Sequence, residues 1–509
     1  MKVCLVRPAT ITTAGAAGED SAPPFGCAYL AGSIRHIGHE VSIVDALGEA
    51  LDRYSRVPEL PTGLRHGLED AEIIERIPDR VDVIGVTCMF SLEWTFSRDL
   101  ILKIRDRFPE VSIVAGGEHI TALPEYVMTD CPAIDFCVAG EGEQTMVDLV
   151  TALAAGTPAT EVPGLIYRRD GAIVTSEARK RIRVLDTIPR PAWDLVPIRN
   201  YLESGTMIGV NFGRSMPILA SRGCPYQCTF CSNPGMWGTL WRAREPQEVF
   251  DEIMSYKKEY GATNFDFYDL TAIVKKQWIV DFCMLLIEND ANITWQLPSG
   301  TRSESIDDEV TNLLFRSGCV YLTYAPESGS PATLERIKKK IRPERMLHSM
   351  RDSYRNGINM KANIILGFPD DTLWDVLQSY WFIVKMAAVG VNDVVCFPFS
   401  PYPGSELFEL CQERGLVNID DDYFIGLSQY SDIRYTKSYS QYFSSSLLRL
   451  FCLSGMGLFY SSSYIFRPVR AWRLIYNIAR KTPRTKIESA IVRVMKKRSE
   501  LRNTKQAPI

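Results

Sequence analysis

The stretch "SRGCPYQCTFCSN", residues 221–233, brings Cys224, Cys228 and Cys231 within eight positions and supplies no fourth ligand nearby. Iron–sulfur clusters and structural zinc sites normally take four protein ligands. On a four-iron cluster, three thiolates leave one iron open to a small chelating molecule, which is what activation of a substrate at a metal requires. We therefore expect these cysteines to hold a [4Fe–4S] cluster with one open iron.

A zinc site completed by a remote His or Cys is the alternative interpretation of the three cysteines. None of the five histidines lies near the loop in sequence. Cys283 and Cys319 fall in apolar segments that are expected to be buried. These features favour the cluster over zinc.

Six apolar runs between residues 215 and 400 are separated by stretches with helical periodicity. We predict a partial (β/α)6 TIM-like barrel over residues 206–410, whose chemistry belongs at the carboxyl ends of the strands. The cysteine loop follows the first of these strands. The six runs are "MPILASRG", "NFDFYDL", "TWQLPSG", "YLTYAPES", "KANIILGFP" and "DVVCFPFS".

The first 160 residues also alternate strand and helix, and their strands are almost continuously apolar. Such strands indicate a parallel sheet that is covered on both faces. We predict an α/β domain with a flavodoxin-like, Rossmann-like fold, which binds ligands beyond the carboxyl ends of its strands. The loops at those ends contain many small residues, at 9–24, 116–117 and 140–143.

The remaining parts are expected to be a connector and a C-terminal domain. In the connector, 161–205, "LIYRRDGAIVT" predicts a hairpin that turns at Asp170-Gly171. "IPRPAWDLVP", 188–197, is too rich in proline for an element interior and is expected to run extended across the surface. Residues 411–509 are expected to form a mainly helical domain with a basic tail.

The net charge of −4 conceals an asymmetry. From residue 467 to the end there are thirteen Lys and Arg against two Glu, a local balance of +11. An anionic partner for this tail and a solvated basic helix are both open interpretations. "LFCLSGMGLFYSSSYIF", 450–466, favours a buried helix, with an interfacial membrane anchor as the alternative.

The composition, 46% hydrophobic and 23% charged, is that of a soluble globular protein. The first residues lack the apolar core of a signal peptide, so we expect a cytoplasmic protein, with peripheral membrane association as a further possibility. The acidic body and the absence of an RNA-binding motif argue against a nucleic-acid partner.

The motif Cys224-x3-Cys228-x2-Cys231, with Phe230 before the last cysteine, resembles the signature of the radical S-adenosylmethionine (SAM) superfamily. The segments "FYDL" (267–270), "PESGS" (326–330), "LGFPDDT" (366–372) and "PYPGS" (401–405) resemble later strand-end motifs of that family. The resemblance implies that the open iron binds SAM, and that reduction cleaves SAM to methionine and a 5′-deoxyadenosyl radical. It also implies a flavodoxin- or ferredoxin-type electron donor.

The same resemblance assigns residues to SAM. Glu327 is expected to accept a hydrogen bond from a ribose hydroxyl or the ammonium group, and Arg302 to pair with the carboxylate. Asp269 has either a structural role or a contact with SAM. The full set of expected SAM-site residues is Phe230, Asp269, Arg302, Glu327, Ser328, Gly367 and Pro369.

The N-terminal half resembles the cobalamin-binding domain of B12-dependent radical SAM enzymes, in "PPFGCAYLAGSIRHIGHEVSIVD" (23–45), "AGGEH" (115–119) and "AGEGE" (139–143). The chain has no Asp-x-His-x-x-Gly motif, so cobalamin is expected to bind without a His ligand to cobalt. His119 is expected to line the corrin edge. The expected cobalamin-site residues are Thr87, Gly116, Gly117, His119, Gly140 and Glu141.

These resemblances imply an enzyme similar in layout to the anaerobic porphyrin-ester cyclase and methyltransferase subgroup. We expect methyl transfer to an unactivated centre of a small or lipid-like substrate. Oxidative cyclisation or rearrangement with the same cofactors is the first alternative. A non-catalytic iron–sulfur sensor is the second.

Overall fold

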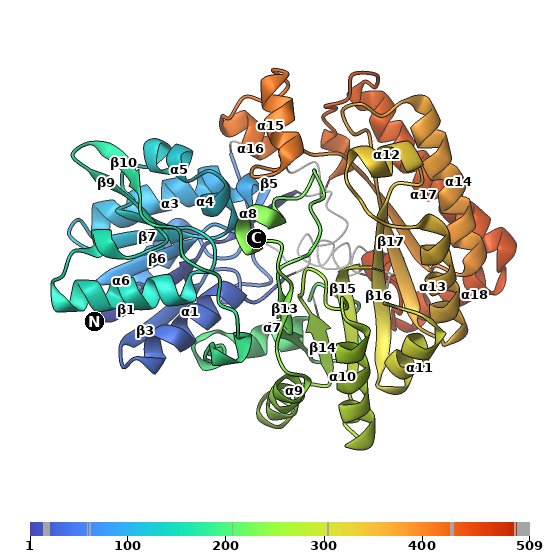
Figure 1. Ribbon diagram of the computed structural model, residues 1–509, viewed down its shortest axis with the longest axis horizontal. Coiled ribbons are helices and arrows are strands. Elements are labelled where there is room, and N and C mark those ends of the chain that lie inside the picture. Colours follow the sequence, from blue (N-terminus) through green and yellow to red (C-terminus); the bar gives the residue numbers. More distant parts are fainter. Residues whose placement is uncertain are drawn as a thin grey trace, which may run out of the picture.

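The computed structural model describes residues 1–13, 21–58, 60, 63–205, 207–302, 305–427, 432–492 and 495. Each half of the chain contains one large β-sheet covered by helices, and the two units lie side by side (Figure 1). Part of the small-residue loop after the first strand, 14–20, lies outside the described residues. The end of the basic tail, residues 496–509, also lies outside them.

The first sheet confirms the predicted flavodoxin-like order. Five of its seven strands are parallel, and in their own sequence order they are arranged 2-1-3-4-5, with the first strand between the second and the third. These strands are β1 (Lys2–Arg7), β3 (Glu40–Asp45), β6 (Val83–Thr87), β7 (Ser112–Gly116) and β8 (Phe136–Val138).

Alternate side chains of β1 enter different hydrophobic cores. Val3 and Leu5 pack in a core shared with α1 and α6, whereas Cys4 and Val6 pack in a core shared with α3. Both faces of the sheet are therefore covered, which is why its strands have no polar alternation. The helices of this unit are α1 (Phe25–His36), α2 (Asp70–Arg76), α3 (Trp94–Arg107), α4 (Glu118–Ala122), α5 (Pro124–Asp130) and α6 (Glu143–Ala155).

The predicted hairpin is present, but it belongs to the first sheet. β9 (Leu165–Arg169) pairs antiparallel with β8 and with β10 (Ala172–Thr175). Asp170 and Gly171 both have positive φ, as a tight hairpin turn requires. A small sheet that the sequence did not predict lies nearby, with strands β2 (Thr10–Thr13), β4 (Tyr54–Arg56) and β5 (Gly63–His66).

The second sheet confirms the predicted partial barrel, with six parallel strands in the order of the chain. They are β11 (Ser215–Ile218), β14 (Asn264–Phe267), β15 (Thr294–Thr301), β16 (Cys319–Glu327), β17 (Asn359–Leu366) and β18 (Asp393–Pro398). The helices that alternate with them are α9 (Pro246–Tyr260), α10 (Lys276–Glu288), α11 (Asp308–Arg316), α12 (Pro331–Arg336), α13 (Pro343–Arg355) and α14 (Leu373–Val389).

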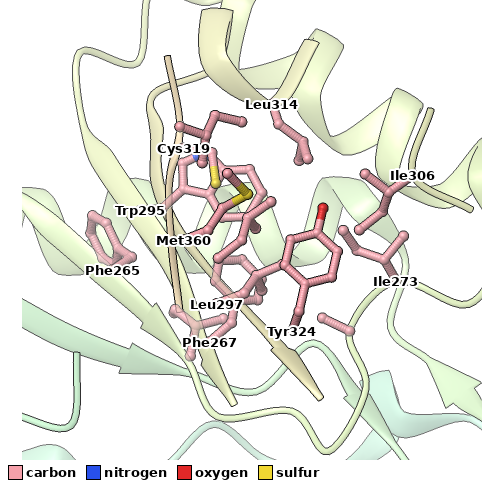
Figure 2. Packing of buried hydrophobic residues seen from close by; sticks show 14 of the residues in the cluster. Phe265, Phe267, Ile273, Trp295, Leu297, Ile306, Leu314, Cys319, Tyr324 and Met360 are labelled. Atoms are coloured by element: carbon pink, nitrogen blue, oxygen red, sulfur yellow. The ribbon is translucent and has the colours of Figure 1, made fainter. Parts of the chain in front are cut away.

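Large aromatic and aliphatic side chains fill the space between the barrel strands and these helices (Figure 2). Phe267 and Trp295 from neighbouring strands pack with their ring centres 5.3 Å apart. Cys283 and Cys319 are buried in this core, as expected for apolar segments.

The proline-rich stretch 188–197 does not run across the surface as predicted. Trp193 is buried, its indole donates to the Tyr256 hydroxyl at 3.1 Å, and its ring packs on Phe25 of α1. The stretch therefore fills the space between the two units, because the large apolar area of Trp193 is better removed from water. The 3₁₀ helix η3 (Leu185–Thr187) precedes the stretch, which includes η4 (Trp193–Leu195) and is followed by α7 (Ile198–Ser204).

The C-terminal region is divided between the two units and does not form the single helical domain that we expected. α15 (Glu406–Glu413) and α16 (Asp421–Gly426) contribute Phe408, Cys411 and Phe424 to a core of the first unit. α17 (Ser445–Phe466) packs on α14 and β18 of the barrel and is followed by α18 (Val469–Arg480). The described helices include none that is both long and apolar enough to cross a bilayer.

Candidate active site

The cysteine loop leaves the first barrel strand through the short strand β12 (Ser221–Arg222), which pairs with β13 (Arg242–Ala243). Gly223 has a φ of +82°, and a Cβ there would lie 2.2 Å from the Leu240 carbonyl oxygen. Only glycine fits this position without a rearrangement. The loop is fixed further on, where the Thr229 amide donates to Ile337 and the Thr229 carbonyl accepts from the Leu407 amide.

The three cysteines are half-buried, free thiols on this one loop. Among the described residues, no three His, Cys, Asp or Glu side chains converge as ligands of a single metal ion. A cubane takes one thiolate at each of several irons, so its ligands need not meet at a point. The donor set and its spacing therefore fit a cluster with an open corner.

Two cations and one carboxylate lie beside Cys228. Lys339 is buried, and its ammonium group donates to the Glu327 carboxylate at 2.9 Å. Arg302 stacks on the ring of Tyr226, within the cysteine loop, at 3.2 Å from the ring centre. Burial raises the pKa of the Cys228 thiol, while the charges of Lys339 and Arg302 act to lower it. The site thus contains positive charge that can offset thiolates.

The sequence did not identify Lys339 as a residue of the site. It is the middle residue of three consecutive lysines, 338–340, and such a run normally indicates a solvated surface. Its ammonium group also lies 5.9 Å from the ring centre of Phe230, which packs on Phe368. Phe230 therefore lies next to Lys339.

Glu327 ends strand β16 with a φ of +65°, which is uncommon for a residue other than glycine. The pairing of β16 with β17 shifts register between Tyr324 and Glu327. The irregular strand end directs the carboxylate toward Lys339, where the sequence predicted a ligand-binding carboxylate. Backbone strain of this kind is often found at functional sites.

Asp269 lies beneath the cysteine loop. Its carboxylate accepts hydrogen bonds from the Ala220 amide at 3.1 Å and the Ser221 hydroxyl at 2.5 Å. Burial raises its pKa to about 6. These contacts support the structural one of its two expected roles, because they fix the chain that leads into the loop.

Three of the expected SAM-site residues contact the outer helices. The Ser328 hydroxyl lies 3.1 Å from that of Ser379 in α14, and Gly367 packs against Leu448 of α17. The Pro369 carbonyl accepts from the Gln441 amide at 3.0 Å, just before α17. The described contacts therefore anchor strand ends to helices and do not join these residues to the cysteine loop.

The loop after β8 is joined to the cysteine loop by a buried ion-pair network. Glu141 lies 3.2 Å from Arg222 and 2.9 Å from Arg242, and Glu143 lies 2.5 Å from Arg222. The side chains of Glu141, Arg222 and Arg242 are only 3–4% exposed. Glu141, which was expected to contact cobalamin, thus connects the first unit to the chain just before Cys224.

This network brings the carboxyl ends of both sheets together. Glu118, at the start of α4 after β7, accepts a hydrogen bond from Ser232 at the end of the cysteine loop. The short helix α8 (Asn233–Trp237) then packs on α4, between the two units in Figure 1. A ligand beyond the strands of the first sheet would therefore lie next to the cysteine loop.

The predicted cobalamin-site residues lie at the carboxyl ends of β6, β7 and β8. Thr87 and Gly116 are partners in the strand register. Gly117 and Gly140 have positive φ, and a Cβ there would meet the Cys88 carbonyl at 2.3 Å and the Arg181 guanidinium at 1.9 Å. At these two positions a side chain would clash with neighbouring residues of the protein itself. A Cβ on Gly116, in contrast, would meet only Val138, at 3.9 Å.

His119 is buried in a cage of side chains instead of lying on an open edge. Its Nδ1 is 2.9 Å from the Ser91 hydroxyl, and its ring contacts Trp94 and Phe424 of α16. Within the described part of the chain, Nε2 has no hydrogen-bond partner. Burial lowers the pKa of His119 to about 3, so the imidazole is neutral at physiological pH.

The ion-pair network predicts that replacing one of its carboxylates by an uncharged amide strongly lowers the stability of the protein. Glu141→Gln leaves buried Arg222 and Arg242 without their shared carboxylate, and we expect a loss of about 3 kcal/mol in unfolding free energy. Urea unfolding measures the loss. Asp79→Asn, in an exposed pair with Arg107, is the control and should cost less than about 1 kcal/mol. Equal small losses would contradict a joining role for the network.

The buried imidazole predicts a pH dependence of stability. The folded pKa of His119 lies below the ordinary value of 6.5, so the unfolded chain binds the proton first. Stability is complete above pH 6.5 and is lost as the pH falls toward 3. Between pH 7 and pH 5 we expect about 2 kcal/mol of loss that His119→Asn lacks, measured by urea unfolding at both pH values. The same pH dependence in both proteins would show that His119 is not buried in its neutral form.

Comparison with known proteins agrees with this arrangement. Residues 218–383 match the radical SAM superfamily, and residues 11–150 match the B12 binding domain. An uncharacterized methyltransferase of Pyrococcus horikoshii is 32% identical over 418 residues, which cover 82% of this chain and 84% of that protein. An anaerobic magnesium-protoporphyrin IX monomethyl ester cyclase of Rubrivivax gelatinosus is 27% identical, covering 80% of this chain and 70% of that protein.

A solved structure has the same fold. The radical SAM methyltransferase TsrM of Kitasatospora setae, with cobalamin and a [4Fe–4S] cluster bound, superimposes with a TM-score of 0.62 at 18% identity. The match covers 81% of this chain and 75% of TsrM. With a cysteine loop that suits a cluster and a cobalamin-type sheet joined to it, the chain belongs to the B12-dependent radical SAM enzymes, which use a [4Fe–4S] cluster, SAM and cobalamin.

Proposed function

We propose that this enzyme transfers a methyl group to an unactivated carbon or phosphorus centre of a small or lipid-like substrate. The observation that carries the proposal is the joining of the first sheet's carboxyl end to the cysteine loop through Glu141 and Arg222. When bound, the cluster would supply the electron that cleaves SAM to a hydrogen-abstracting radical, and cobalamin would supply the methyl group. Because the two cofactor sites lie on adjoining loops, transfer of the methyl group to the substrate is favoured over its loss to solvent.

Each cofactor has its own proposed residues. Cys224, Cys228 and Cys231 bind the cluster, and the cations beside Cys228 offset its negative charge. Further SAM contacts are proposed for Phe230, Arg302 and Glu327. We propose that Asp269, Ser328, Gly367 and Pro369 hold the surrounding strand ends in place. Corrin contacts are proposed for Thr87 and Gly116, and Gly116 has the stronger support because its Cβ position is uncrowded. We propose that Gly117, His119, Gly140 and Glu141 shape the loops around the corrin through their contacts with other residues.

Exposed apolar side chains at the strand ends support an apolar substrate. Met89 and Phe90 follow β6 and are 38% and 57% exposed. Leu240 beside the cysteine loop and Leu270 after β14 are also exposed. Large apolar groups left in water at a ligand-binding edge are typical of sites that the ligand covers.

The surroundings of the enzyme complete the proposal. A flavodoxin- or ferredoxin-type protein donates the electron, and no nucleic acid takes part. The protein acts in the cytoplasm, and its C-terminal region contacts a membrane peripherally. All thirteen cysteines lie among the described residues and are unpaired, which suits a reducing compartment. A domain limit is proposed near residue 205, since the hairpin at 165–175 belongs to the first sheet and residues 411–509 are divided between the two units.

Oxidative cyclisation or rearrangement with the same cofactors is the second candidate. It is favoured by the similarity to the anaerobic cyclase, which extends over most of both chains. The two candidates differ in product mass, because methylation adds one CH2 whereas cyclisation removes hydrogen or adds oxygen.

The proposal predicts a strict dependence on the cysteine loop. Anaerobically reconstituted enzyme should hold about four iron and four sulfide per chain and should form 5′-deoxyadenosine from SAM with a reductant. Cys228→Ala should lose the iron and sulfide and should no longer form 5′-deoxyadenosine. Cys283→Ala, in the barrel core, should retain the cluster and the activity. Iron analysis and mass spectrometry of products measure these outcomes. Bound zinc, or dependence on Cys283, would overturn the cluster; a product without an added CH2 would overturn methyl transfer.

A second prediction concerns the buried lysine. Lys339→Met removes a positive charge beside Cys228, so the cluster should accept an electron at a more negative potential. Redox titration followed by electron paramagnetic resonance measures the shift. Lys340→Met removes the same charge from an exposed neighbour and is the control. An unchanged potential in Lys339→Met, or equal shifts in both, would contradict a role for Lys339 at the cluster.

A further inference from the structure

Helix α18 has an amphipathic sequence but no buried residue. Val469, Trp472 and Tyr476 recur at helical spacing and are 60%, 74% and 54% exposed, and Ile475 beside them is 60% exposed. A helix at the surface of a globular protein normally turns such a face toward the core. In the described part of the chain, nothing covers the apolar face of α18.

The exposed apolar surface extends onto neighbouring helices. Ile465 and Phe466, at the end of α17, are 75% and 50% exposed. α17 runs beside α14 in the same direction, since Tyr380 contacts Phe451 and Ala387 contacts Arg467. These helices lie along one side of the barrel with α18 (Figure 1), and the exposed large side chains of α14 and α17 are Leu373, Trp374, Leu377, Trp381, Leu447, Leu450 and Leu453.

The C-terminal part of this surface is cationic. From residue 433 to residue 487 the sequence contains ten Lys and Arg and no Asp or Glu. Arg473, Arg480, Lys481 and Arg484 are exposed on or just after α18. The preceding body of the protein carries a net negative charge, so an excess of positive charge accompanies the exposed apolar face of α18.

An anionic lipid bilayer fits both properties. Apolar side chains enter the boundary of the acyl chains, aromatic rings lie at the headgroups, and Lys and Arg contact the phosphates. A second copy of the chain would place like charges face to face, which disfavours self-association. The end of the tail, "KKRSELRNTKQAPI", is itself mostly polar and basic and could not cover an apolar face. Aliphatic residues such as Val469 and Ile475 offer no stacking platform to nucleic acid.

We propose that α18, with the end of α17 and the outer face of α14, docks on an anionic phospholipid surface. The inference deepens the peripheral membrane contact proposed above and names its surface and partner. It does not depend on methyl transfer, because lipid binding is measured without turnover. The contact is interfacial, with α18 lying in the plane of the membrane.

Flotation of the full-length protein with vesicles tests the proposal. We expect binding to vesicles of phosphatidylcholine mixed with phosphatidylglycerol, weaker binding to phosphatidylcholine alone, and weakening by salt. The double variant Trp472→Gln/Tyr476→Gln should reduce binding at least about tenfold, because two interfacial aromatic side chains are removed. Arg473→Gln should reduce it about fivefold.

Helix α11 provides matched controls, since Phe315 and Arg316 are exposed on another part of the barrel. Phe315→Gln and Arg316→Gln should bind vesicles as the unchanged protein does. Circular dichroism and 5′-deoxyadenosine formation without vesicles should be the same in all variants, because these residues lie outside the proposed active site. No binding to anionic vesicles overturns the proposal, as does equal loss in α18 and α11 variants. A dimer that dissociates on Trp472→Gln/Tyr476→Gln, without vesicle binding, would assign the surface to a second copy instead.

Discussion

The buried ion pairs of Glu141 with Arg222 and Arg242 are the constraint on which the arrangement of this enzyme depends. They join a loop of the first unit to the two short strands that bracket the cysteine loop. Charges removed from water are tolerated only when each has its partners, so the network specifies one docking geometry more than it adds stability. Tyr29 and Trp237 pack against the Arg222 guanidinium, with ring centres 5.3 Å away, and exclude water from it.

The cysteine loop is held by contacts from several separate segments of the chain. Asp269 holds the residues before the loop, and Gly223 makes the turn into it. Ile337 and Leu407 bind the backbone of Thr229 from two later segments. The thiols themselves therefore sit on a backbone whose conformation is fixed by hydrogen bonds, as a cluster with one open corner requires if its ligands are to stay in place.

The sequence predicted those features that depend on local pattern. Apolar runs gave both sheets, and the positive φ of Asp170 and Gly171 matches the turn signal of the hairpin. Contacts between distant residues could not be predicted in this way. Glu141 and Arg222 are 81 positions apart, and a single sequence contains no sign of their pairing. Lys339 illustrates the same difficulty, since it is buried beside Glu327 although its two lysine neighbours are exposed.

The prediction that the C-terminal region forms a single domain was wrong for a related reason. Helical periodicity identifies an apolar face but not the surface that it meets, and α16 packs on the first unit while α17 packs on the barrel. Ser328 and Gly367 could be placed at strand ends, but their contacts with α14 and α17 follow from that later packing.

The backbone hydrogen bonds that join Thr229 to Ile337 and Leu407 also affect how the protein matures. During synthesis the cysteines leave the ribosome well before either of these segments exists, so the loop at first has no fixed shape. A cluster delivered at that stage would meet a chain still free to coordinate it wrongly. The two backbone hydrogen bonds that fix Thr229 can form only once α15 has been synthesised, so a cluster bound earlier would rest on a loop that lacks them.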